Sequence, residues 1–149
     1  PGDPKLRLER DSLKLMLQHP ETFDQAWNGI TQADFTHPGY AAVFRLVSVT
    51  PLSADWADKL RESAPNELVA QLLVALLVEP LLRIPDEAYS YAYSSRLRLA
   101  RLTREIGDCK ARLRRTNPLD DKESFDAQFA HLTELEMERK RLLNASLND

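Results

Sequence analysis

The stretch that decides the fold is DEAYSYAYSSRLRLARLTREIGDCKARLRR, residues 86–115. Its apolar residues recur at alternating spacings of three and four: Leu99, Leu102, Ile106, Cys109 and Leu113. This spacing places all five on one side of a helix, like the seam of a coiled coil. The stretch therefore predicts one long helix of about 30 residues, roughly 45 Å at 1.5 Å per residue.

Positive charge dominates most of the same helix. Eight cations lie between the seam positions: Arg96, Arg98, Arg101, Arg104, Lys110, Arg112, Arg114 and Arg115. Only Glu105 and Asp108 oppose them, so residues 96–115 carry 8 − 2 = +6 in a chain of net charge −3. Three interpretations stay open: a solvated face partly neutralised by acids of the next helix, a surface for a partner protein, and a nucleic-acid-binding module. The last is the least favoured, because no aromatic residues are interleaved for base stacking.

A second long helix is predicted to fold back on the first. Asn117-Pro118 ends the first helix, and the acids Asp120, Asp121 and Glu123 favour a new helix start. The apolar stripe predicted for this second helix consists of Phe125, Phe129, Leu132, Leu135 and Leu142. A turn this short forces the two helices to run antiparallel, so their stripes are expected to pair.

Prolines divide the preceding residues into short helices. The first is expected from about Glu9 to Gln18, and the second starts at Pro20 and ends at Asn28-Gly29, with Phe23, Ala26 and Trp27 on it. The other three are expected after Pro38, after an N-cap at Ser53 and after an N-cap at Asn66. The helix after Asn66 is the most apolar and is predicted to be the central one.

The sequence thus predicts an all-α fold, a small helical bundle followed by a long antiparallel helical hairpin. We expect residues 1–8 to be an interdomain linker remnant, because Pro1-Gly2-Asp3-Pro4 is typical of a linker in a larger protein. The bundle is expected over residues 9–85 and the hairpin over residues 86–149.

Signals for catalysis, metal binding or membrane insertion are missing from the pattern. His19, His37 and His131 have no ligand partners at metal spacing, and four scattered glycines make no phosphate-binding loop. The single cysteine rules out an internal disulfide and fits a reducing cytoplasm. No apolar run approaches the roughly 18 residues of a membrane span. We therefore expect no enzyme activity and no cofactor in this fragment, and a cytoplasmic location.

Two motifs point to a family. The run Glu9-Arg10-Asp11-Ser12-Leu13-Lys14-Leu15-Met16-Leu17-Gln18-His19-Pro20-Glu21 resembles the opening of the C-terminal domain of bacterial replicative primase, the DnaG type. The later run Ala33-Asp34-Phe35-Thr36-His37-Pro38, with Tyr40 and Phe44, is similar to that family's second signature. The order of parts, a linker, a bundle and a hairpin, also resembles the family over nearly the whole chain.

The resemblance implies a protein-interaction domain that docks primase onto the N-terminal domain of the replicative helicase (DnaB type) and so couples primer synthesis to unwinding at the replication fork. It implies that the parent is a DNA primase, a DNA-directed RNA polymerase, whose zinc and magnesium belong to upstream domains. A second candidate partner is the acidic tail of a single-stranded-DNA-binding protein. No sequence-specific nucleic-acid binding is expected. The alternatives kept are the N-terminal domain of the helicase itself, as an oligomerisation unit, and a helical nucleic-acid-binding module.

The turn between the two long helices is the candidate partner-binding site, because it is expected to lie farthest from the bundle. Leu119 and Phe125 flank a turn that would ordinarily be polar, and arginines stand beside it. Apolar anchors rimmed by arginine are typical of binding hot spots. An alternative is that Leu119 and Phe125 only close the end of the hairpin core. The candidate residues are Arg114, Arg115, Asn117, Pro118, Leu119 and Phe125.

Overall fold

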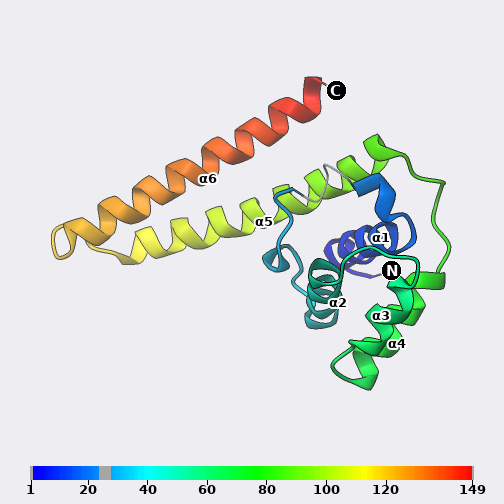
Figure 1. Ribbon diagram of the computed structural model, residues 1–149. Coiled ribbons are helices and arrows are strands. Elements are labelled where there is room, and N and C mark those ends of the chain that lie inside the picture. Colours follow the sequence, from blue (N-terminus) through cyan, green and yellow to red (C-terminus); the bar gives the residue numbers. More distant parts are fainter. Residues whose placement is uncertain (1, 24–27, 149) are drawn as a thin grey trace. The chain divides into compact units, whose positions relative to one another are not determined.

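The structure is a computed structural model that describes residues 2–23 and 28–148. In that part the chain is helical and contains no strand (Figure 1). The α-helices are α1 (Pro4–Gln18), α2 (Pro38–Val49), α3 (Trp56–Glu62), α4 (Glu67–Val78), α5 (Glu87–Arg115) and α6 (Lys122–Asn148). Two short 3₁₀ helices, η1 (Pro20–Phe23) and η2 (Gln32–Asp34), connect α1 to α2. The predicted all-α class, a bundle followed by a hairpin, is confirmed.

The chain forms two compact units, Pro1–Leu97 and Arg98–Asp149, and the division falls inside α5. It comes later than the sequence suggested, because the first turns of α5 belong to the core of the bundle. Leu97 is buried in that core, Tyr89 and Tyr93 pack against it, and Thr22 Oγ1 and Ser90 Oγ form a buried hydrogen bond of 2.7 Å. Tyr89 and Tyr93 are therefore packing residues of the first unit.

The core of the first unit gathers around α4. This helix contacts α1, α2 and α3, as expected of the most apolar element. Leu73 and Leu76 on its inner face are fully buried. Its outer face is open, however, and Leu68 is 79% exposed, so the helix is central without being enclosed.

Three boundaries in the first unit differ from the sequence expectation. Helix α1 begins at Pro4 rather than near Glu9, because Asp3 caps it by accepting from Lys5 N at 2.9 Å and Pro occupies the first turn. The Pro and Asp that resembled a linker are thus a helix start. Helix α3 begins at Trp56 rather than just after Ser53. The helix expected from Pro20 is a single 3₁₀ turn in its described part, and Ala26 and Trp27 lie outside the described residues.

In the second unit, α5 and α6 run antiparallel on either side of a short turn (Figure 1). The predicted seam of α5 is confirmed: Leu102, Ile106 and Cys109 are buried, with Leu99 and Leu113 packed against them. On α6 the buried residues are Leu132, Leu135 and Leu142.

The predicted stripe of α6 was wrong at Phe129, which is 56% exposed. The inward position is taken by the neighbouring Gln128, which is half-buried. Positions 125, 128, 132, 135, 139 and 142 keep the spacings of three and four that a seam requires. Two of these positions, 128 and 139, carry polar residues. A pattern of apolar residues alone therefore pointed to Phe129 in place of Gln128.

Candidate partner-binding site at the hairpin tip

The tip of the hairpin is a turn organised by Asn117. Its Oδ1 accepts from Leu119 N at 2.9 Å, and its Nδ2 donates to Asp120 Oδ2 at 3.1 Å. Its carbonyl oxygen accepts from Asp120 N and from Asp121 N, both at 3.1 Å. An Asn side chain that bonds the backbone two residues on is a known way to fix a tight turn. Asn117 therefore orders the turn from within.

Helix α6 starts from this turn with an acidic cap. Asp121 Oδ1 accepts from Ser124 N at 3.0 Å, and Asp121 O accepts from Phe125 N at 3.0 Å. A carboxylate at a helix N-terminus satisfies a free amide and is favoured by the helix dipole. The sequence-based start of the second helix is confirmed.

Leu119 is the most exposed large apolar side chain at the tip, at 92%. Its amide is held by Asn117, so the backbone that carries this exposed side chain is ordered. Pro118 is also exposed, and Phe125 in the first turn of α6 is half-buried. Leu119 therefore does not close the hairpin core, whereas Phe125 is partly covered.

Arg114 and Arg115 end α5 with both side chains exposed. Cations are favoured at a helix C-terminus by the dipole, so the site needs no acidic partner to hold them there. The structure places the six candidate residues around one turn, with apolar and cationic side chains both open to solvent.

Polar contacts close the hairpin just behind the tip. Thr116 Oγ1 donates to Gln128 Oε1 at 3.3 Å, and Cys109 Sγ donates to Gln128 O at 3.4 Å. These hydrogen bonds join the end of α5 to α6 next to the turn. Sequence reasoning missed Gln128, and its only signal was the continuous three-and-four spacing of the α6 seam.

The two family signatures lie in the first unit, where their side chains form hydrogen bonds that join its helices. Glu9 is 1% exposed, and its carboxylate accepts from Thr36 N at 2.8 Å, Thr36 Oγ1 at 2.6 Å and His37 N at 3.2 Å. His37 in turn caps α2, since its Nδ1 accepts from Gly39 N at 3.0 Å and Tyr40 N at 3.3 Å. Glu9 thereby joins α1 to the start of α2.

The neighbouring Arg10 joins α1 to the end of α4. Its guanidinium forms a two-pronged ion pair with Glu79, one bond being 2.9 Å, and donates to Tyr40 Oη at 3.0 Å. These bonds hold the pKa of Arg10 above its ordinary value and the pKa of Glu79 below its ordinary value. Gln18 Nε2 also donates to Leu76 O and Glu79 O, both at 2.8 Å, which satisfies the last carbonyls of α4.

Neither a metal-binding cluster nor a membrane-spanning helix occurs in residues 2–23 and 28–148. No group of three or more His, Cys, Asp or Glu side chains that could hold a metal occurs among the described residues. No helix in the same ranges is long and apolar enough to cross a membrane. His37 has a clear structural use as the cap of α2, and His19 Nδ1 lies 3.1 Å from Glu21 Oε1 in an exposed pair.

Comparison with known proteins gives one consistent result. The family model described as DNA primase DnaG DnaB-binding matches residues 9–128. The whole chain is 31% identical to part of a DNA primase of Mycobacterium leprae and 30% identical to part of one from Mycolicibacterium smegmatis. It spans about a quarter of the length of these relatives (24% and 25%). A DNA primase of Streptomyces coelicolor is 30% identical over 76% of this chain and 20% of its own length.

Among solved structures, the helicase binding domain of primase from Mycobacterium tuberculosis matches with a TM-score of 0.68 and 29% identity. The match covers 93% of this chain and 91% of that one. The similarity therefore extends over both units of the fold.

Proposed function

Since this chain belongs to the DnaG DnaB-binding family of DNA primases, we propose that it docks its parent primase onto the replicative helicase. The observation that carries the proposal is the match over 93% of the chain to the helicase binding domain of a mycobacterial primase. The tip geometry adds a physical means, because an exposed Leu119 beside Arg114 and Arg115 is the kind of surface that forms binding hot spots.

In this proposal the contact is made at the N-terminal domain of the helicase, and it keeps primer synthesis close to the point of unwinding. The polymerase chemistry, with its zinc and magnesium, belongs to the rest of the parent protein. The primase relatives favour this proposal over a helicase N-terminal domain, which was the alternative from sequence.

A second partner is proposed on narrower grounds. The exposed cations of α5, among them Lys110 and Arg112, would attract the acidic tail of a single-stranded-DNA-binding protein. A nucleic-acid-binding module would use the same cations, and a steep fall of affinity with salt would indicate contacts to nucleic-acid phosphates. Phosphate contacts lose affinity by about 10³–10⁵ between 50 and 200 mM salt when six to ten are made.

The test is a titration of the 149-residue chain into the hexameric replicative helicase of the same organism by calorimetry, at two salt concentrations. We expect saturable binding at both. Absence of binding, or binding to single-stranded DNA alone, would refute the proposal.

A further inference from the structure

The hairpin has two different sides along its seam. On one side the charges are paired: Arg98 lies 3.6 Å from Glu138 across the hairpin, and Arg101 lies 3.8 Å from Glu105. Helical periodicity puts these residues on the same side of the seam on both helices. On that side, Arg98 and Arg101 each have an acidic partner.

The other side of the seam holds a groove of about 400 Å³ between α5 and α6. Thr103, Ile106 and Lys110 line it from α5. Glu136, Arg139, Lys140 and Leu143 line it from α6. Its volume falls within the range of protein binding pockets.

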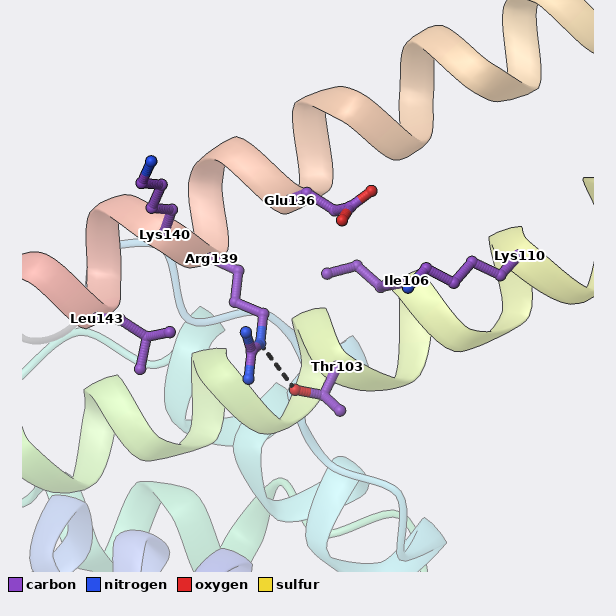
Figure 2. Close-up of a pocket in the computed structure, with 7 residues that line it drawn as sticks. All are labelled: Thr103, Ile106, Lys110, Glu136, Arg139, Lys140 and Leu143. Atoms are coloured by element: carbon purple, nitrogen blue, oxygen red, sulfur yellow. Dashed lines mark hydrogen bonds between the residues drawn. The ribbon is translucent and has the colours of Figure 1, made fainter.

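Figure 2 shows how these side chains are disposed. Arg139 reaches from α6 to α5, where its Nε donates to Thr103 Oγ1 at 3.4 Å. Glu136 projects into the space between the helices, and Lys140 projects away from α5 toward solvent. Ile106 and Leu143 supply apolar surface, and Leu143 is 37% exposed.

The charge in the groove is incompletely balanced. Lys110 and Arg139 line it against one acid, Glu136, and Lys140 also lines it, with its ammonium group directed toward solvent. In residues 2–23 and 28–145, whose side chains the structure describes, neither Lys110 nor Lys140 makes an ion pair. A ligand that brings negative charge and an apolar side chain would complement this surface.

The same side of the hairpin continues toward the tip. Arg114 follows Lys110 by four residues on α5, and Phe129 precedes Glu136 by seven on α6, so both share the side of the groove. Phe129 is 56% exposed, which makes it the largest apolar side chain offered there. We define the groove face as Lys110 and Arg114 on α5 with Phe129, Lys140 and Leu143 on α6.

We propose that the groove face is the side of the hairpin that meets the helicase, and that it receives an acidic segment of the helicase carrying a bulky apolar side chain. This inference rests on the proposed function. It is supported by the charge imbalance, by exposed Phe129 and by continuity through Arg114 with the tip.

The chain supplies a matched control for each kind of contact. Phe129→Asp is compared with Met137→Asp, since Met137 is 54% exposed on the same helix but lies off the groove face. Lys140→Glu is compared with Arg141→Glu, an adjacent exposed cation whose reversal changes the net charge equally. Circular dichroism of each 149-residue variant checks that helicity is kept.

Each variant is titrated into the hexameric helicase. We expect Phe129→Asp and Lys140→Glu each to raise Kd by about tenfold, the scale of a single hot-spot contact, and the two controls by less than about twofold. Equal effects of variant and control, or no effect of either groove-face variant, would overturn the inference while leaving helicase docking intact. If the wild-type chain does not bind, docking itself fails and the inference fails with it. If the groove-face changes weaken only the binding of an acidic tail peptide of a single-stranded-DNA-binding protein, the proposed helicase segment is not the ligand of this face.

Discussion

The buried carboxylate of Glu9 gives the most quantitative prediction about the fold. Glu9→Ala removes an acceptor that serves two backbone amides and one hydroxyl, at 2.8, 3.2 and 2.6 Å. Each lost hydrogen bond costs about 1 kcal/mol net, more when a partner stays buried and unpaired. Removal of a buried charge offsets part of this loss. We therefore expect a fall of about 2–4 kcal/mol in the free energy of unfolding, and about 1–2 kcal/mol for Glu9→Gln, which keeps one acceptor oxygen.

The assay is urea unfolding followed by tryptophan fluorescence. Both tryptophans lie within residues 1–97, so the signal reports on the first unit. If the free energy of unfolding falls by about 2 kcal/mol per M urea, Glu9→Ala should lower the midpoint by about 1–2 M. The control is Glu62→Ala, an exposed acid at the end of α3. A Glu9→Ala midpoint equal to that of the control would show that the bonds from Thr36 and His37 do not brace α1 against α2.

Three further predictions follow from the ion pairs and the division into units. Arg114→Glu with Arg115→Glu should slow association with the helicase and reduce its salt dependence in stopped-flow traces, because rim charges act mainly on encounter; an unchanged association rate would exclude them from the contact. A chain truncated after Leu97 should stay folded by circular dichroism and lose stable helicase binding. Truncation after Pro85 should also destabilise the bundle, because it deletes the first turns of α5 from the core. Equal melting temperatures of the two truncated chains would contradict this. Hydrogen bonds from Arg10 lower the pKa of Glu79. The stability that this carboxylate contributes is therefore present above its ordinary pKa of about 4.3 and is lost as pH falls through the lowered value of the folded state. Between pH 6 and pH 3 the free energy of unfolding should change less with pH in Glu79→Gln than in Glu62→Gln.

The sequence predicted the hairpin well because one physical rule governs it. Spacings of three and four over many turns leave little choice about which side of α5 is buried, and Leu102, Ile106 and Cys109 are there. The same rule failed at Phe129, because the pattern was read from residue type. Gln128 occupies the seam position, and its side-chain amide is hydrogen-bonded to Thr116 and Ser124.

The hydrogen bonds that join the helices of the first unit could not be derived from local pattern. Glu9 meets Thr36 across 27 residues, and Arg10 meets Glu79 across 69. Pattern rules describe neighbours one or two turns apart, so a charged residue in an amphipathic helix reads as solvent-facing until its distant partner is known. The signature motif thus pointed to the family without showing what its residues do.

The tip was only partly predictable. Asn117-Pro118 and the following acids located the turn, and the structure adds that Asn117 orders it and that Leu119 is exposed. The distribution of unpaired charge around the hairpin depends on ion pairs between the two helices, such as Arg98 with Glu138. Residue spacing within one helix does not predict such pairs. Partner binding at the tip therefore stays a prediction.

The measurement that tests helicase docking through the hairpin tip most directly is the affinity of the Leu119→Asp variant for the hexameric helicase. Leu119 is 92% exposed, so its replacement should leave helicity and stability unchanged. The matched control is Leu68→Asp, which alters a leucine that is 79% exposed on α4 in the first unit. We predict that Leu119→Asp weakens binding by about 1–2 kcal/mol, the scale of a hot-spot residue, while Leu68→Asp binds like the wild type. Wild-type affinity in the Leu119→Asp variant would contradict docking through the tip.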